Sequence, residues 1–192
     1  MFYLSLALHT CRSTAGITVF DGKVFAVGGR ESSMCHKTVE YYDQHTGKWR
    51  FVAPMNKRRG SVSVASLNSY LYAFGGHDAP LTNPACLRTN TIERYDLKMD
   101  TWTIIAALDF GRDGMGIGVL GNSLYIVGGY DGRNYLNNSE KFDPNKKEFV
   151  SVAPLSHARS GAFVIAIPNG PNYLSGCSSE SVFTPEGSAT VQ

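Results

Sequence analysis

Three pairs of carboxylates recur along the sequence and are the residues best suited to acid–base chemistry. In each pair an aspartate follows a glutamate by three positions: Glu40/Asp43, Glu93/Asp96 and Glu140/Asp143. Two carboxylates in one cleft can serve as general acid and general base. A catalytic pair is needed only once, whereas these pairs return along the chain. We therefore interpret them as structural, with aspartates that hydrogen-bond to turns.

The other groups that could catalyse a reaction or bind a metal are scattered. The five histidines form no His-x-x-x-His pair, no Gly-x-Ser-x-Gly turn or phosphate loop occurs, and no histidine and tyrosine cluster could bind copper. The four cysteines, Cys11, Cys35, Cys86 and Cys177, lack zinc-site spacing, and we expect free thiols in a reducing compartment. The sequence predicts no enzyme activity, no cofactor and no metal.

Charge and hydropathy exclude two further classes of partner. A net charge of +2 is too small to attach the protein to nucleic acid or anionic lipid through bulk electrostatics. The densest basic run, Lys57-Arg58-Arg59, is interpreted as a solvated loop followed by an arginine of the repeat described below, rather than as a phosphate or acidic-peptide contact. The apolar stretch 2–8 is too short to span a membrane and has no basic flank like that of a signal peptide. We expect a cytoplasmic protein, with the cytoskeleton as a candidate location.

The carboxylate pairs belong to a longer pattern that repeats about every 50 residues. An apolar tetrad precedes a glycine pair, an aromatic–aspartate pair follows, a large aromatic comes six residues after the aspartate, and an arginine ten residues after that aromatic. The glycines are Gly28-Gly29, Gly75-Gly76 and Gly128-Gly129; the paired aromatics are Tyr42, Tyr95 and Phe142; the large aromatics are Trp49, Trp102 and Phe149; and the arginines are Arg12, Arg59, Arg112 and Arg159. Chance does not produce so many fixed spacings.

Each repeat divides into four short runs that read as strands. After each arginine the apolar residues alternate, as in Ile17 and Val19, which indicates a strand with two distinct faces. Four short antiparallel strands per repeat predict a propeller blade. Because glycine weakens a strand, the recurring glycine pairs predict a bulge or a close backbone approach. We expect the large aromatics to be core residues that bridge one blade to the next.

Together these elements resemble the kelch motif over residues 2 to about 167. The segments GGHDAP (75–80), IERYD (92–96) and VGGYDGRNYLNNSEKFDP (127–144) are similar to the late repeats of kelch-like proteins of the BTB–BACK–kelch type. The resemblance implies an all-β fold, a kelch β-propeller with about three complete four-stranded blades and partial blades at both ends, in an incomplete ring. In that family the propeller usually captures a protein substrate, and upstream BTB and BACK domains bind cullin-3.

The resemblance implies a protein-interaction module similar to the substrate-recognition propeller of a cullin-3 ubiquitin-ligase adaptor. No BTB or BACK region is present here, so cullin-3 would be reached only through domains absent from this chain. Some relatives bind actin, which makes an actin-binding cytoskeletal protein the alternative, and a kelch-type enzyme is a weaker one.

We expect kelch repeats over residues 1–167 and a divergent, disordered tail over 168–192, where Ser175-Gly176 replaces the glycine pair. A half-ring leaves blade edges open, so we expect the chain to self-associate or to be only marginally folded.

Binding residues are expected in the loop that follows each glycine pair, because loops on a rigid scaffold carry function. The middle loop, His77–Asn90, carries six extra residues. By resemblance to the family these loops line the substrate face, and the candidates are Arg30, His36, His77, Asp78, Arg88, Tyr130, Asp131 and Arg133. Arginine and tyrosine are favoured because they are frequent interface hot spots. For each residue the alternative of a solvent-exposed turn position stays open.

Overall fold

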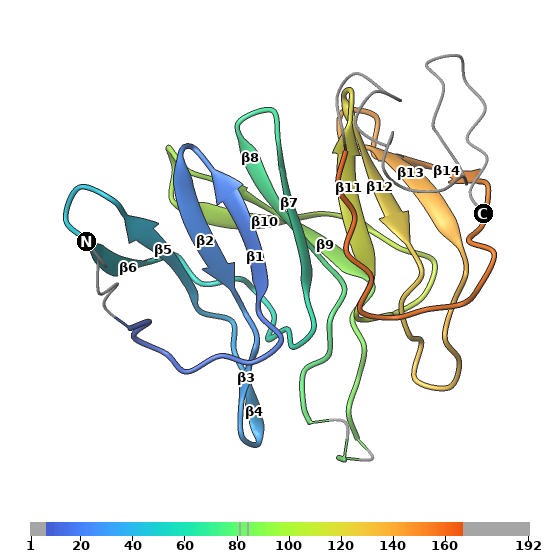
Figure 1. Ribbon diagram of the computed structural model, residues 1–192, viewed down its shortest axis with the longest axis horizontal. Helices are drawn as coiled ribbons and strands as arrows, with labels where there is room; N and C mark the ends of the chain where they lie inside the picture. Colours follow the sequence, from blue (N-terminus) through green and yellow to red (C-terminus); the bar gives the residue numbers. More distant parts are fainter. Residues whose placement is uncertain (1–6, 81, 84, 167–192) are drawn as a thin grey trace, which may run out of the picture.

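Three antiparallel sheets form the body of the protein. The computed structural model describes residues 7–80, 82–83 and 85–166, which contain strands and turns but no helix. Each sheet has four strands, and the sheets stand side by side in chain order (Figure 1). Blade A contains β1 (Gly16–Phe20), β2 (Lys23–Val27), β5 (Val39–Asp43) and β6 (Lys48–Val52); blade B contains β7 (Ser63–Leu67), β8 (Tyr70–Phe74), β9 (Thr91–Asp96) and β10 (Thr101–Ala107); blade C contains β11 (Gly116–Leu120), β12 (Ser123–Val127), β13 (Ser139–Asp143) and β14 (Glu148–Val152). The prediction of an all-β fold with three complete blades is confirmed.

Within each blade the strands pair in the order of the chain, and tight turns make this possible. Asp21 and Gly22, between β1 and β2, have φ angles of 50° and 69°. Asn68 and Ser69 take the same left-handed conformation between β7 and β8. Two left-handed residues give the hairpin turn whose twist matches that of its strands. A further hairpin, β3 (Arg30–Glu31) with β4 (Met34–Cys35), projects from the loop between β2 and β5 (Figure 1).

The first strands of the blades pack against one another. β7 lies between β1 and β11, and small residues allow the approach. A Cβ at Gly16 would meet Val64 of β7 at 2.7 Å, so glycine at this position leaves room for the β-branched side chain of the next blade. The alternation of small and branched residues in these strands therefore sets how closely the blades pack.

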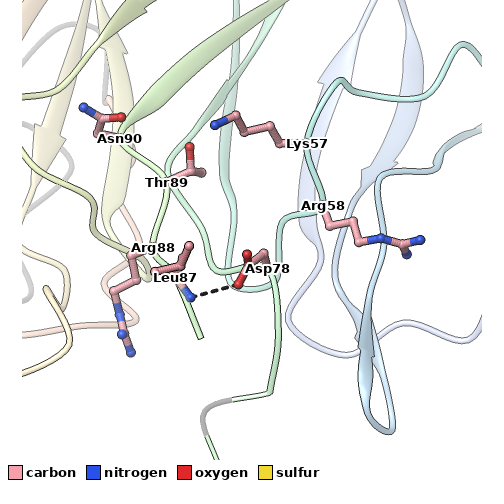
Figure 2. Close-up of a pocket in the computed structure, with 7 residues that line it drawn as sticks. All are labelled: Lys57, Arg58, Asp78, Leu87, Arg88, Thr89 and Asn90. Carbon is pink, nitrogen blue, oxygen red and sulfur yellow. Dashed lines mark hydrogen bonds between the residues drawn. The ribbon is translucent and has the colours of Figure 1, made fainter. Parts of the chain in front are cut away.

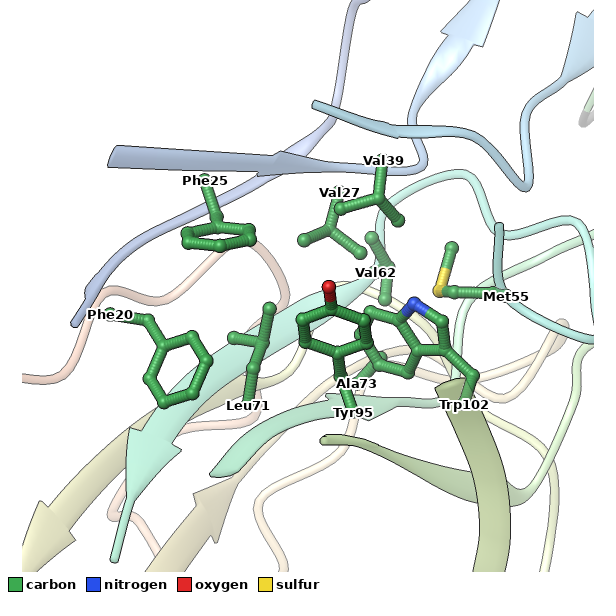
Figure 3. Packing of buried hydrophobic residues seen from close by; sticks show 10 residues of the cluster. All are labelled: Phe20, Phe25, Val27, Val39, Met55, Val62, Leu71, Ala73, Tyr95 and Trp102. Carbon is green, nitrogen blue, oxygen red and sulfur yellow. The ribbon is translucent and has the colours of Figure 1, made fainter. Parts of the chain in front are cut away.

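Apolar cores fill the space between neighbouring blades. Phe25 and Val27 of blade A meet Leu71 and Trp102 of blade B in one cluster (Figure 3). The Trp102 side chain is also fixed by its Nε1–H, which donates to the Ala53 carbonyl at 3.0 Å. A second cluster joins blades B and C through residues that include Phe74, Ile92, Leu124 and Phe142, with Phe149 partly buried against them. Trp102 and Phe149 thus each lie on the side of their blade that faces the preceding blade.

At the start of the described chain, the first blade has an open side. Trp49 is only half-buried and stacks on Tyr42 with ring centroids 5.6 Å apart. The apolar stretch 2–8, at the end where a partial blade is expected, falls almost entirely on residues outside the described part of the chain.

At the other end, residues 155–166 follow blade C as an extended segment that forms no strand (Figure 1). Gly161 N–H donates to the Gly114 carbonyl at 2.7 Å, and Val164 lies where a Cβ on Gly116 or Gly118 would touch it. This segment therefore lies beside β11 as β11 lies beside β7. The predicted tail, 168–192, and its Cys177 are outside the described residues.

Candidate functional site

A buried arginine–glutamate pair anchors each blade. The Arg59 guanidinium donates to the carbonyls of Gly75 and Thr91 and to the Glu93 carboxylate, with Nη2 at 2.9 Å from Oε1. Both charged side chains are completely buried. Arg12 with Glu40 and Arg112 with Glu140 repeat the arrangement in the other two blades. The repeat arginine and the repeat glutamate are therefore two halves of one structural unit.

Glu40 is held as a carboxylate by several donors. Burial acts to raise the pKa of Glu40, but hydrogen bonds from Arg12 and His9 outweigh it, so the pKa lies below its usual value. The aspartate three residues later has a separate role, because Asp43 Oδ1 accepts the backbone N–H of His45 at 3.0 Å and closes the following turn. The carboxylates of a pair thus serve different structural partners. The sequence showed that the arginines recur and that the glutamates recur, but it did not show that each glutamate binds the arginine of its own blade.

The glycine pairs allow neighbouring blades to exchange backbone hydrogen bonds. Gly28 has a φ of 59°, and a Cβ there would lie 2.4 Å from the carbonyl oxygen of Arg59 in the next blade. That same carbonyl accepts the Gly29 N–H at 2.8 Å. Gly76 with Arg112 and Gly129 with Arg159 repeat this bond. The expected close backbone approach is therefore present, and it ties Arg59 and Arg112 each to two blades at once.

The long loops of all three blades emerge at the same end of the molecule. They connect β2 to β5, β8 to β9 and β12 to β13, and they occupy the lower end in Figure 1. We call the surface formed by residues 30–38, 77–80, 82–83, 85–90 and 130–138 the long-loop face, and the opposite end, with the short β–β turns, the turn end. Every candidate binding residue lies on the long-loop face: Asp78 and Arg133 are exposed, Arg30, Arg88, Tyr130 and Asp131 are half-buried, and His36 and His77 are buried.

A charged network in this face joins blade B to blade C. Asp113 Oδ2 lies 3.1 Å from His77 Nδ1 and 2.9 Å from Arg88 Nε. The Asp113 backbone exchanges two hydrogen bonds with Tyr130, at 3.0 and 2.9 Å. The Arg88 guanidinium carbon in turn sits 4.8 Å from the centre of the Tyr130 ring. Asp113 therefore contacts three of the predicted candidates, His77 and Arg88 through its buried carboxylate and Tyr130 through its backbone.

Sequence reasoning did not single out Asp113, although a signal was available. The residue after the repeat arginine is Ser13, Gly60, Asp113 or Ser160. Three of the four repeats thus carry a small residue at this position, and only one carries an aspartate. Asp113 is therefore a feature of one blade and not of the repeat. The network is accordingly found at the junction of blades B and C and has no counterpart between blades A and B, because Gly60, which takes the place of Asp113 there, has no side chain.

Two histidines of the long-loop face and the thiol of Cys35 are buried. His36 and His77 are 8% and 2% exposed, so they are placed to hold the loops rather than to touch a partner. Burial, together with the nearby Cys86, raises the pKa of the Cys35 thiol and keeps it protonated. Cys11, Cys35 and Cys86 are free thiols. Across the described ranges, no three His, Cys, Asp or Glu side chains are grouped to hold a metal ion.

Two shallow hollows flank the segment that carries Leu87 and Arg88. The first has a volume of about 370 Å³ and is shown in Figure 2; its lining comprises Lys57, Arg58, Asp78, Leu87, Arg88, Thr89 and Asn90. The second, of about 440 Å³, is lined by Cys86, Leu87, Arg88, Phe110, Gly111, Asp131 and Arg133. Both combine cations, carboxylates and exposed apolar side chains, which is the composition of a protein contact surface rather than of an enclosed small-molecule site.

Comparison with known proteins identifies the repeats. A family model described as the Kelch motif matches residues 11–56, 58–108 and 111–156. The chain belongs to the kelch-repeat family. Each match extends from the segment that carries a repeat arginine to just beyond the last strand of the blade that this arginine anchors, so the buried arginine–glutamate unit lies inside every kelch motif.

Several curated kelch proteins are similar to this chain. Kelch-like protein 4 of Homo sapiens is 45% identical over 89 residues, which cover 46% of this chain and 12% of that protein. Kelch repeat-containing protein kel-10 of Caenorhabditis elegans is 30% identical over 138 residues, 69% of this chain and 23% of that protein. Kelch-like protein 23 of Pongo abelii is 27% identical over 90% of this chain and 28% of its own length. The kelch chain therefore spans only a minor part of these relatives.

The fold also matches a solved structure. The structure of YjhT superimposes with a TM-score of 0.67 at 14% sequence identity, covering 78% of this chain and 54% of that one. This similarity supports the kelch propeller architecture seen in the blades. Within the described part of this kelch chain, no helix is long and apolar enough to cross a membrane.

Proposed function

We propose that this kelch-repeat chain is a protein-interaction module that holds its partner on the long-loop face. The observation that carries the proposal is the gathering of three long loops at one end of the blades, with the charged network around Asp113 joining the loops of blades B and C. A rigid scaffold that presents variable loops suits recognition, because little conformational entropy is lost when a partner binds.

The contact residues that we propose are those of the face that solvent can reach. They are Arg30, Asp78, Arg88, Tyr130, Asp131 and Arg133 from the predicted set, with Leu87 and Tyr135 added because they are 69% and 65% exposed. Large apolar and aromatic side chains exposed beside arginines form the usual centre of a protein interface. His36 and His77 support the loops from beneath.

The finer role that we propose is substrate recognition for a cullin-3 ubiquitin ligase in the cytoplasm. Support comes from similarity to kelch-like proteins, including 49% identity over 89 residues to Kelch-like protein 5 of Homo sapiens. In this proposal cullin-3 is bound by BTB and BACK domains of the kind named above, which are not among these 192 residues. An actin-binding role is the alternative that the experiment below separates.

Partner capture in cells tests the proposal. The chain is expressed with a proximity-labelling tag, as wild type and as Arg133→Ala/Tyr135→Ser, which removes exposed groups of the long-loop face. The matched control, Lys98→Ala/Lys146→Ala, removes exposed charges at the turn end. Quantitative mass spectrometry then compares the labelled proteins, with actin and cullin-3 scored by name.

The proposal predicts that labelling of at least one abundant partner falls several-fold in the long-loop variant and stays unchanged in the control, while all three proteins keep the same melting temperature. Equal labelling by wild type and long-loop variant would place the binding surface elsewhere. Loss of actin alone would replace the adaptor role with the cytoskeletal one.

A further inference from the structure

A cysteine and a histidine from neighbouring blades meet at one gap beneath the long-loop face. Cys35 is the last residue of β4 in the loop of blade A, and His77 follows the glycine pair of blade B. Gly60 lies in the segment that connects the two blades, and a Cβ on it would come within 2.6 Å of His77 Nε2 and 2.9 Å of Cys35 Sγ. The absent side chain of Gly60 therefore leaves a gap that both the nitrogen and the sulfur border.

The Nε2 atom of His77 is a buried nitrogen without a hydrogen-bond partner among the described residues. Its side chain is 2% exposed, and Nδ1, on the other side of the ring, lies 3.1 Å from Asp113 Oδ2. Because a carboxylate only accepts hydrogen bonds, Asp113 places the hydrogen of the neutral ring on Nδ1 and leaves a lone pair on Nε2. Carboxylates in this position orient the histidines that bind metal ions.

The thiol of Cys35 is equally buried and its backbone is fixed. The residue has no exposed surface, and burial raises the pKa of the thiol. The Cys35 carbonyl accepts a hydrogen bond from Arg58 Nη1 at 2.9 Å, and Cys35 pairs with Arg30 in the β3–β4 hairpin. A thiol gives up its proton when a metal ion takes the place of that proton. The sulfur is therefore held at the gap in advance, as a ligand that a cation can deprotonate.

The two atoms at the gap select the kind of ion. Thiolate and imidazole are ligands for ions such as Cu⁺ and Zn²⁺, whereas Mg²⁺ and Ca²⁺ require oxygen. Structural Zn²⁺ takes four ligands, and in the described part of the chain no third His, Cys, Asp or Glu completes a group that could hold a metal. The nearby Cys86 is engaged in its own loop, because its Sγ lies 3.1 Å from the Ala79 carbonyl oxygen. One sulfur and one nitrogen suit Cu⁺, which is stable with two ligands.

We propose that Cys35 Sγ and His77 Nε2 bind one Cu⁺ ion between blades A and B. On binding, the thiol releases its proton to solvent, the thiolate and the imidazole each donate an electron pair, and the copper keeps its oxidation state. The ion ties the β3–β4 hairpin of blade A to the long loop of blade B. This inference goes beyond the proposed function and does not depend on it. The two residues belong to different repeats, so their spacing in the sequence predicts no metal site.

Competition with a Cu⁺ chelator tests the inference. The other three thiols of the full chain are first removed by Cys11→Ser/Cys86→Ser/Cys177→Ser, so that the resulting single-thiol chain keeps only Cys35. Cu⁺ is then distributed, without oxygen, between this protein and bathocuproine disulfonate, and the absorbance of the chelator complex gives the affinity. X-ray absorption spectroscopy of the loaded single-thiol chain identifies the atoms bound to copper.

Four further substitutions in the single-thiol chain separate the ligands from their surroundings. Cys35→Ser removes the sulfur, and His77→Gln removes the nitrogen. Gly60→Ala fills the gap while both ligands remain, and its backbone accepts alanine because Gly60 has no left-handed φ. His157→Gln is the matched control, because that histidine is exposed.

The inference predicts one Cu⁺ per single-thiol chain, bound through one sulfur and one nitrogen. Cys35→Ser, His77→Gln and Gly60→Ala should each weaken binding at least about tenfold, since even the loss of a residue that only supports a ligand costs that much. The control should bind as the single-thiol chain does. Ag⁺, which does not change oxidation state, should raise the melting temperature of the single-thiol chain and not that of Cys35→Ser, because a ligand of the folded state stabilises it.

Full affinity in Cys35→Ser or in His77→Gln would overturn the inference, as would a copper site without nitrogen. Zn²⁺ that binds more tightly than Cu⁺ would contradict the choice of ion. If a variant fails to fold, the absorption spectrum of the loaded single-thiol chain decides alone: one sulfur with one nitrogen supports the site, and any other set of ligands contradicts it.

Discussion

At the scale of single residues, the fold depends on buried charges that are fully paired. Arg59 and Glu93 have no exposed side-chain surface, and each satisfies the other together with backbone groups of two strands. Burial lowers the pKa of Arg59 and Glu93 opposes that shift, so the guanidinium stays charged at neutral pH. Removing one member of such a pair leaves an uncompensated charge in the core.

The variant Glu93→Gln should therefore lower the free energy of unfolding by about 3 kcal/mol or more. Urea denaturation followed by tryptophan fluorescence measures this change. Arg50→Gln is the control, because Arg50 is half exposed and pairs with Asp43 at the surface; it should cost under about 1 kcal/mol. Equal losses in the two variants would show that the buried pair does not anchor the blade.

A second prediction concerns the glycine pair. Gly28 and Gly22 both have positive φ, but only at Gly28 would a Cβ meet another atom, the Arg59 carbonyl. Gly22→Ala should cost about 1 kcal/mol from the left-handed backbone alone. Gly28→Ala should cost about 1–3 kcal/mol more, because the next blade must move. Thermal denaturation compares them, and similar losses would mean that the close approach is not tight.

Several of these residue roles could be read from the sequence and others could not. The recurring glycine pairs predicted a close approach of two backbone segments, because such an approach requires a residue without a side chain. The recurring arginines predicted the regular spacing of the repeats along the chain. The Arg–Glu pairing spans 28 residues in blades A and C and 34 in blade B. A contact between strands at such a separation has no local signature. Asp113 was missed for the same reason.

At the scale of strands and blades, the large aromatic between blades carries much of the packing. Trp102 is 8% exposed and lies in the core between blades A and B, whereas Trp49 occupies the same repeat position and is half-buried. The same side chain in the equivalent strands β6 and β10 thus has different surroundings at the two positions. The period-two alternation and the glycine pairs were enough to predict the four strands of each blade, since both follow from local backbone geometry.

Trp102→Ala should lower the free energy of unfolding by about 3–5 kcal/mol, as large core truncations do. Trp49→Ala should cost at least about 2 kcal/mol less, because a side chain at an open blade face loses less packing. Guanidinium unfolding monitored by circular dichroism provides both values. A Trp49→Ala loss as large as that of Trp102→Ala would mean that the face of blade A is covered.

At the scale of the whole molecule, the described blades form an open arc with apolar groups at its ends. Phe163 and Ile165 are 87% and 70% exposed on the segment that lies beside β11. Exposed apolar edges promote association between chains. The extent of the arc follows from three repeats of about 50 residues, which the sequence predicts. The positions of the loop side chains on the long-loop face do not follow from it, because loops lack periodicity.

We therefore predict concentration-dependent association of the isolated chain. Sedimentation velocity should show oligomers that dissociate on dilution, and Phe163→Ser/Ile165→Ser should raise the monomer fraction, since it removes apolar surface from the open end. A wild-type chain that remains monomeric up to high concentration, with a sharp thermal transition, would contradict this expectation.

The central claim, that the long-loop face holds the partner, is tested most directly by site-specific photo-crosslinking in cells. A photoreactive amino acid replaces Tyr135 on the long-loop face in one chain and Lys98 at the turn end in another. The account predicts that the partner crosslinks strongly from position 135 and weakly or not at all from position 98. Crosslinks that form from position 98 and not from position 135 would contradict it and move the binding surface to the turn end.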